Sequence, residues 1–212
     1  MKTEYLIAAL AADARSVSRP IARTLWIAAA AGLVVAGLIF FIEIGARPDL
    51  SVVIESPRFL YKYVLTLSLF VAAMGLMLHL AHPGAVPTGW LWALAAPPAL
   101  LVAAVIVEFV VVPSSAWVDK LVGMNSLVCL VLIPVLSAAP LVALLLALRQ
   151  GATTRPVLAG ATAGLVASAI GATLYATHCQ DDSALFIAAW YVIAITIVTV
   201  LGAALGARLL RW

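Results

Sequence analysis

Long apolar stretches alternate with short polar segments along the chain. An α-helix needs about 20 apolar residues to cross the hydrocarbon core of a bilayer, and six stretches reach that length. They run over about Leu25–Ile44, Leu60–Leu80, Trp90–Val112, Ser126–Leu148, Val157–Thr177 and Ala184–Ala207. The pattern predicts an all-α fold, a polytopic membrane bundle with six transmembrane helices.

The composition agrees with a location in the bilayer. Hydrophobic residues make up 66% of the 212-residue chain and charged residues only 10%, whereas soluble domains average about 25% charged residues. A water-soluble fold of this composition would lack polar residues for its surface. We divide the chain into an N-tail, residues 1–24, and a six-helix transmembrane domain, residues 25–212.

Lysine and arginine are unevenly distributed between the two sides of the predicted bundle. The N-tail, the C-terminal end and the second and fourth loops share one side, which holds eight of the 12 Lys and Arg residues. Cytoplasmic loops are enriched in these residues, so we expect both termini in the cytoplasm. Arg47, Arg58 and Lys62 fall on the opposite side and weaken the bias.

Small residues recur at four-residue spacing in the last two spans, at Gly160 and Gly164 and at Gly202 and Gly206. Such spacing lets two helix backbones approach closely, which matters because lipid supplies no hydrophobic drive between helices. We expect these faces to pack within one chain, and a homodimer is the alternative.

The chain has two cysteines, Cys129 and Cys179, and the predicted topology places both at the outer face of the membrane. In a bacterial periplasm that side is oxidising. Two interpretations remain open. The pair is either structural, as a disulfide or as inert buried thiols, or it responds to an oxidant or a metal.

Five other side chains are auxiliary ligand candidates for a heavy-metal ion held transiently by the two thiols. His178, Asp181 and Asp182 share the loop of the second cysteine, and Glu43 and Glu108 lie near the outer ends of the first and third spans. Thiolate and imidazole suit soft or borderline metals, and carboxylates at membrane depth are costly and often functional. The alternatives are a solvated loop, a helix start and carboxylates that reach the interface.

Catalytic and transport signatures are absent from the sequence. It has no glycine-rich nucleotide-binding loop and no Ser-His-Asp pattern, so we expect neither an enzyme nor a resident cofactor. The middle of the spans is almost entirely apolar, which argues against a transporter. The net charge of +3 is too small to indicate direct binding of nucleic acid.

The N-tail is amphipathic when it is drawn as a helix. Leu6, Ile7 and Leu10 share one face, and Glu4 and Arg15 lie opposite. Such a segment either lies on the membrane surface or docks into a groove of a partner, and disorder is the remaining alternative.

Several segments carry recognisable motifs. The chain begins Met-Lys-Thr-Glu-Tyr-Leu-Ile-Ala-Ala-Leu-Ala-Ala-Asp-Ala, and residues 129–137 and 155–164 form further characteristic stretches. Residues 173–191 contain His-Cys, then Gln-Asp-Asp-Ser, then Trp-Tyr. Together these segments resemble NrsF-type proteins, which are membrane anti-sigma factors of bacteria. This chain has Gln180-Asp181 where the family usually has proline or a similar residue followed by glutamate, so the acid is kept.

The resemblance implies a function for the sites above. NrsF-type proteins hold an extracytoplasmic-function sigma factor inactive at the inner membrane, and a cysteine pair is associated with sensing heavy metal or oxidant. Carried over to this chain, that pair is Cys129 and Cys179. The cytoplasmic N-tail would bind the sigma factor, through the residues Tyr5, Leu6, Ile7 and Leu10.

Two rival functions use the same features. A membrane thiol oxidoreductase would pass electrons through the cysteine pair, although it usually needs a second reactive pair. A small transporter is the other rival. Both leave the N-tail without a role.

Overall fold

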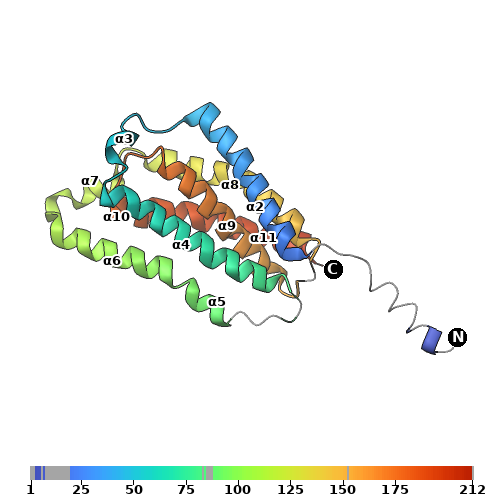
Figure 1. Ribbon diagram of the computed structural model, residues 1–212. Helices are drawn as coiled ribbons and strands as arrows, with labels where there is room; N and C mark the ends of the chain where they lie inside the picture. The colour runs from blue at the N-terminus through green and yellow to red at the C-terminus, as the bar shows by residue number, and fades with distance from the viewer. Residues whose placement is uncertain are drawn as a thin grey trace.

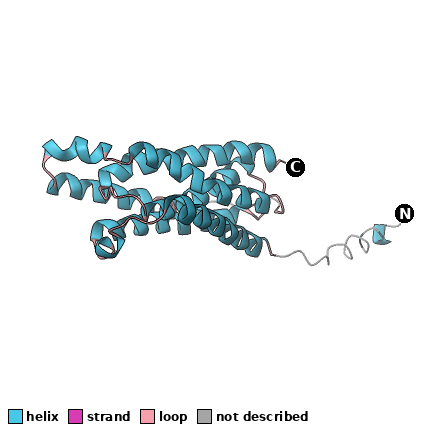
Figure 2. Cartoon of the chain, turned by 90° about the horizontal axis from the view of Figure 1, so that it is seen from above, coloured by secondary structure: helices cyan, strands magenta, loops and turns pink. Residues whose placement is uncertain are grey.

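A computed structural model describes residues 3–5, 7, 20–82, 84, 88–151 and 153–211. This part of the chain is helical and contains no strand (Figure 2). Six helical segments in it are long and apolar enough to cross a membrane, which confirms the predicted fold class. The cytoplasmic location of the two termini stays a prediction.

The six spans follow the apolar stretches of the sequence closely. In chain order they are α2 (Ile21–Ile39) continued by π-helical η1 (Phe40–Ile44), α4 (Pro57–Leu80), α5 (Thr88–Ala93) with α6 (Ala96–Val111), α8 (Ser126–Leu148), α9 (Pro156–Ala176), and α10 (Ala184–Phe186) continued by η3 (Ile187–Tyr191) and α11 (Val192–Leu209). The connections contain the short helices α3 (Leu50–Val53), η2 (Ser114–Ala116) and α7 (Trp117–Val122).

The third span differs from the single helix expected from Trp90 to Val112. It is divided into α5 and α6 by a turn at residues 94–95. Proline lacks a backbone N–H and suits the first turn of a helix, where that donor has no partner. Pro97 and Pro98 lie in the first turn of α6, so the helix restarts there.

Helix α9 occupies the centre of the bundle and packs against α4, α8 and α11, while α2 packs on α8 (Figure 1). Glycines allow the closest of these approaches. A Cβ placed on Gly160 would lie 2.2 Å from the Gly202 carbonyl oxygen, and one on Gly164 would lie 2.7 Å from the Val198 carbonyl oxygen. The expected packing between the small faces of the last two spans within one chain is therefore confirmed.

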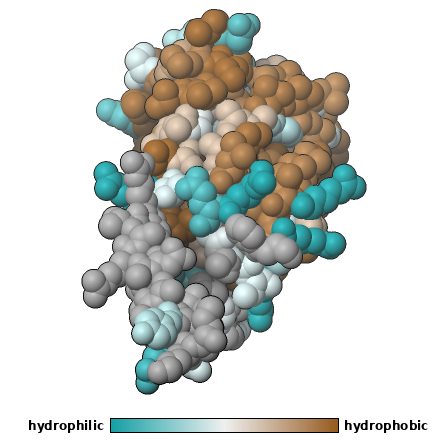
Figure 3. All heavy atoms as spheres, turned by 90° about the vertical axis from the view of Figure 1, so that its right-hand side faces the viewer, coloured by the Kyte–Doolittle hydropathy of each residue, from teal (hydrophilic) through white to brown (hydrophobic). Residues whose placement is uncertain are grey.

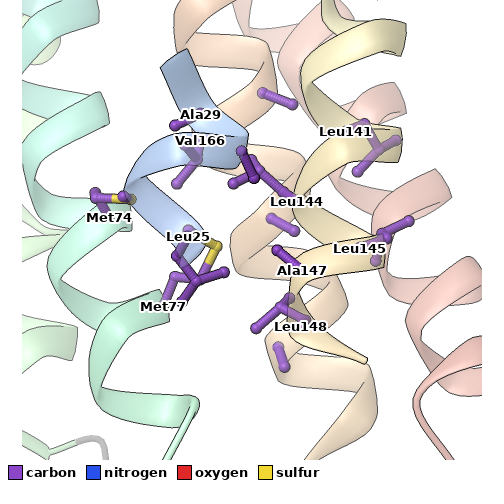
Figure 4. Close-up of a cluster of buried hydrophobic side chains, with 14 of the residues drawn as sticks. Leu25, Ala29, Met74, Met77, Leu141, Leu144, Leu145, Ala147, Leu148 and Val166 are labelled. Atoms are coloured by element: carbon purple, nitrogen blue, oxygen red, sulfur yellow. The ribbon is translucent and has the colours of Figure 1, made fainter. Parts of the chain in front are cut away.

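An apolar cluster fills the end of the bundle where α2 begins. Leu25 from α2, Met77 from α4, Leu148 from α8 and Val166 from α9 are buried in it (Figure 4). Seen from outside, this end carries a band of hydrophilic residues across a largely hydrophobic face (Figure 3).

A second cluster, which contains both cysteines, lies at the opposite end of the bundle. The chain passes from the end of η1 to Arg47, whose backbone N–H donates to the Thr177 carbonyl at 3.1 Å, just before Cys179. The first span has 24 residues, which corresponds to about 36 Å of helix. The start of α2 and the two thiols therefore lie at opposite ends.

Candidate functional site

Cys129 and Cys179 are free thiols buried in the same cluster of side chains. Cys129 lies in the first turns of α8 and Cys179 follows the end of α9, and both are 0% exposed. The other fully enclosed members include the aromatic residues Phe40, Tyr175, Phe186 and Tyr191. The structure therefore brings together two cysteines that are far apart in sequence. The predicted topology placed them at the same end of the bundle but did not show that they are close.

Two cations hold the backbone at Cys179. The Lys62 ammonium donates to the Cys179 carbonyl oxygen at 3.0 Å, and the Arg47 guanidinium donates to the same oxygen at 3.3 Å. The Cys179 thiol donates a long hydrogen bond of 3.8 Å to the Asp181 carbonyl. The carbonyl and the thiol of Cys179 thus both have hydrogen-bond partners, although the side chain lies among apolar groups.

Asp182 neutralises these cations. Its carboxylate lies 2.5 Å from the Lys62 ammonium and 3.0 Å from the Arg47 guanidinium, which also pairs with Asp49 at 2.7 Å. Lys62 is 1% exposed and Arg47 is 7% exposed. A buried charge is tolerated only when it is paired. Arg47 and Lys62, two of the cations on the unexpected side of the charge count, are paired in this way with Asp182.

Asp181 anchors the start of the helix that carries Cys129. Its carboxylate accepts hydrogen bonds from the backbone N–H of Met124 at 3.2 Å and from the backbone and side-chain N–H groups of Asn125, both at 2.9 Å. Negative charge at a helix N-terminus is favourable because free N–H groups point outward there. Gly123, at φ +58°, permits this approach, since a Cβ there would lie 2.8 Å from the Asp181 carboxylate.

Glu108 and His178 attach further elements to the same loop. One Glu108 oxygen accepts from the Leu185 backbone N–H at 3.1 Å, and His178 Nδ1 lies 3.1 Å from the Gly45 carbonyl. Ser183 also accepts from Leu185, at 3.2 Å, so the helix start expected beside the aspartates is present. Glu43 is exposed and lies outside this network.

The auxiliary-ligand candidates are therefore mostly occupied with structural contacts. In the described part of the chain, no group of three or more His, Cys, Asp or Glu residues stands close enough to hold a metal ion. Any metal at the thiol pair would have to rely on the two sulfurs or displace one of these contacts.

Burial raises the pKa of the Cys179 thiol, and the nearby Lys62 ammonium opposes this effect only in part. Hydrogen bonding to Arg47 lowers the pKa of Asp49, and the same bond raises the pKa of the guanidinium. At neutral pH the Cys179 thiol is therefore protonated, while the Arg47 guanidinium keeps its charge.

The loop that carries Cys179 also borders an open cavity of about 670 Å³. Gln180, Asp181 and Asp182 form one side of it, and Asp119 and Lys120 contribute to the other. The cavity gives solutes access to the outer surface of the loop but not to the buried thiols.

The structure describes two of the four N-tail residues that were predicted to bind a partner. Tyr5 and Ile7 are 71% and 60% exposed. Leu6 and Leu10 lie outside the described residues.

A family model described as negative regulator of sigma F, NrsF, matches residues 10–212. The chain belongs to the NrsF family. Two curated relatives align with the chain over its full length, and each alignment includes 100% of both proteins. They are a probable anti-sigma-F factor from Azospira oryzae, 34% identical, and an anti-sigma-F factor from Caulobacter vibrioides, 35% identical. No solved structure matches the chain.

Proposed function

We propose that this chain is a membrane anti-sigma factor that sequesters an extracytoplasmic-function sigma factor at the bacterial inner membrane. The observation that carries the proposal is the match to anti-sigma-F factors over the full length of both chains. A bundle with six membrane-length helices supplies the anchor that such sequestration needs.

The sigma factor binds the cytoplasmic N-tail, through Tyr5, Leu6, Ile7 and Leu10. The exposure of Tyr5 and Ile7 supports this role, because apolar side chains held away from a core are available to a partner. The N-tail leads into α2 at the end of the bundle opposite the thiols, so the partner and the signal act on different sides of the membrane.

The signal is a heavy metal or an oxidant that acts on Cys129 and Cys179. Metal capture releases the thiol protons, and disulfide formation passes two electrons and two protons to the oxidant. The burial of both thiols in one cluster supports a shared response. It also keeps the resting pair protected, so that reaction requires the loop of Cys179 to open.

Contacts between the Cys179 loop and two helices would carry the change at the thiols to the other end of the bundle. Asp181 holds the start of α8, and Asp182 holds Lys62 in α4. When Cys179 moves to react with Cys129, both attachments are disturbed and the helices that lead to the other end repack. A coupling of about 1–3 kcal/mol between the two ends would change the affinity for the sigma factor about 5–150-fold.

A deletion tests the proposal. Removing residues 1–15 should abolish co-purification of the sigma factor with the membrane protein and raise transcription from a sigma-dependent promoter. Replacing Cys129 and Cys179 with serine should leave the complex intact in unstressed cells. Retention of the sigma factor by the deletion variant would refute the role of the N-tail.

The same experiment separates this proposal from its rivals. An oxidoreductase or a transporter would not release a sigma factor when the N-tail is removed. The chain has only two cysteines, which leaves a thiol oxidoreductase without a second pair. The glycine faces of α9 and α11 are occupied within the chain, so they give no support to a homodimer.

A further inference from the structure

A cleft of about 430 Å³ lies between α4 and α6, near the end of the bundle that carries the thiols. Its polar end is formed by Arg58 in the first turn of α4, by Glu108 and by Asp182. Its apolar wall follows α6 back to Leu100, which lies about 12 Å further into the span. The cleft is therefore polar at the membrane surface and apolar at membrane depth.

The rim of the cleft faces the bilayer. Val107 and Val111 on α6 are 61% and 67% exposed, and apolar side chains on a membrane-spanning helix are solvated by lipid chains. The apolar wall therefore meets acyl chains and not water. Tyr61 bridges the two helices by donating to the Leu100 carbonyl at 3.0 Å, which fixes the inner limit of the cleft.

Glu108 brings an unsatisfied hydrogen-bond acceptor to this cleft. The residue is 7% exposed; one oxygen accepts from Leu185, and the other, Oε1, has no partner among the described residues. A buried carboxylate oxygen without a donor is costly. This oxygen is enclosed in the structure, but the terminal torsion of glutamate is soft, so rotation of the carboxylate can turn it toward a donor in the cleft.

The neighbouring groups define the donor. Asp182 also borders the cleft, but its oxygens are paired with Arg47 and Lys62. No cluster of metal-ligating side chains is present in the described part of the chain, which disfavours a metal ion on Glu108. A ligand with one ammonium group matches the single open oxygen, and the exposed Arg58 guanidinium at the mouth suits a phosphate.

We propose that the cleft binds one phospholipid with an ethanolamine headgroup, whose ammonium donates to Glu108, whose phosphate pairs with Arg58 and whose acyl chain lies along α6. A primary ammonium is required, because a choline headgroup has no N–H to donate. A glycerol headgroup carries no cation for the carboxylate. The site goes beyond the proposed regulatory function and does not depend on it.

Native mass spectrometry of the full-length protein in mild detergent tests the site. The protein is titrated with ethanolamine, choline and glycerol phospholipids that carry identical acyl chains. The ethanolamine lipid should bind about tenfold more tightly than the other two, as a charge-assisted hydrogen bond predicts. Equal binding of the ethanolamine and choline lipids, or tightest binding of the glycerol lipid, would overturn the proposal.

Matched variants locate the contact. Glu108→Gln keeps an acceptor for Leu185 and should remove the preference for the ethanolamine lipid, while Glu43→Gln, at an exposed glutamate at the same end of the bundle, should retain it. Arg58→Gln, at an exposed position, should lower the affinity for all three lipids. Persistence of the preference in Glu108→Gln would overturn the proposal. If Glu108→Gln fails to fold, the proposal is tested by the relative affinities of the three lipids for the wild-type protein and by their affinities for Arg58→Gln.

Discussion

At the end where α2 begins, Leu25, Met77 and Leu148 pack in a cluster of apolar side chains, whereas at the other end the thiol cluster is bordered by buried ions and carboxylates. Lys62, Arg47 and Asp182 all lie within hydrogen-bonding range of the loop that carries Cys179 or belong to it. Apolar side-chain packing stabilises one end of the bundle, and ion pairs with hydrogen bonds contribute to the stability of the other.

This difference bears on how each end responds to chemistry. Apolar packing changes little with pH, metal or oxidant, because its contacts carry no charge. Paired charges and thiols change when a proton, a metal or an electron is gained or lost. Under the proposed function, the thiol end therefore receives the signal, and the apolar end transmits the movement.

The largest effect should come from the charges at the thiol end. Asp182→Asn removes the carboxylate that neutralises Lys62, whose side chain is 0% exposed. Loss of one partner from a buried ion pair costs about 3–5 kcal/mol. We expect a decrease of that size in the free energy of unfolding, measured by denaturant titration in mixed micelles.

The matched control is Asp49→Asn. Asp49 also pairs with Arg47, but its side chain is 46% exposed, so solvent replaces the lost interaction and the decrease should be much smaller. Equal losses for the two variants would mean that the buried pair contributes no more than a surface pair.

The close packing of the last spans gives the next largest effect. Gly160→Ala places a Cβ 2.2 Å from the Gly202 carbonyl oxygen, and overpacking of this kind typically costs about 1–3 kcal/mol. Gly37→Ala is the control, because nothing lies within 4 Å of its added Cβ. Thermal unfolding of both variants in detergent should show destabilisation for Gly160→Ala alone. A stable Gly160→Ala protein would contradict the packing described here.

A smaller effect should follow from removing the anchor of α8. Asp181→Ala takes away the acceptor for the N–H groups of Met124 and Asn125, and loss of a helix cap costs about 0.5–2 kcal/mol. Hydrogen exchange at the first turn of α8 should accelerate. Asp119→Ala, at an exposed carboxylate in α7, should leave that exchange unchanged. If the amides of the first turn of α8 exchange at the same rate in Asp181→Ala, Asp181 does not anchor the helix that carries Cys129.

The smallest change concerns the thiol itself. In a Cys129→Ser variant, Cys179 is the only remaining thiol, and its alkylation rate can be followed against pH. Burial raises the pKa of this thiol, so the half-maximal rate should occur above the pH of about 8.5 that is typical of a free cysteine. The same protein unfolded in detergent serves as the control. A lower midpoint in the folded protein would show that Lys62 outweighs burial.

Much of the fold could be predicted from hydrophobic pattern, because each span had to be long and apolar enough for the bilayer. The turn before α6 was missed, although Pro97 and Pro98 mark it, because proline is also tolerated within membrane helices. The contact between the last two spans was predicted, since glycine at four-residue spacing is a local signal.

The site was predicted less completely. The pattern placed both cysteines at one end, but it did not reveal that Arg47 meets Asp182, 135 positions away, or that Lys62 meets Cys179, 117 positions away. No periodicity encodes such pairs. The signal was present in another form, because Arg47 and Lys62 were among the exceptions in the charge count. Positive residues on the unexpected side of a membrane protein are worth examining as partners of buried carboxylates.

A sigma-dependent reporter in cells that carry Cys129→Ser and Cys179→Ser together tests the central claim most directly, with cadmium or an oxidant applied at sublethal dose. The account predicts that the wild-type protein releases the sigma factor and the reporter rises, whereas the double variant keeps the reporter at its unstressed level. Normal induction in a double variant that is present in the membrane at wild-type abundance would contradict sensing by the cysteine pair.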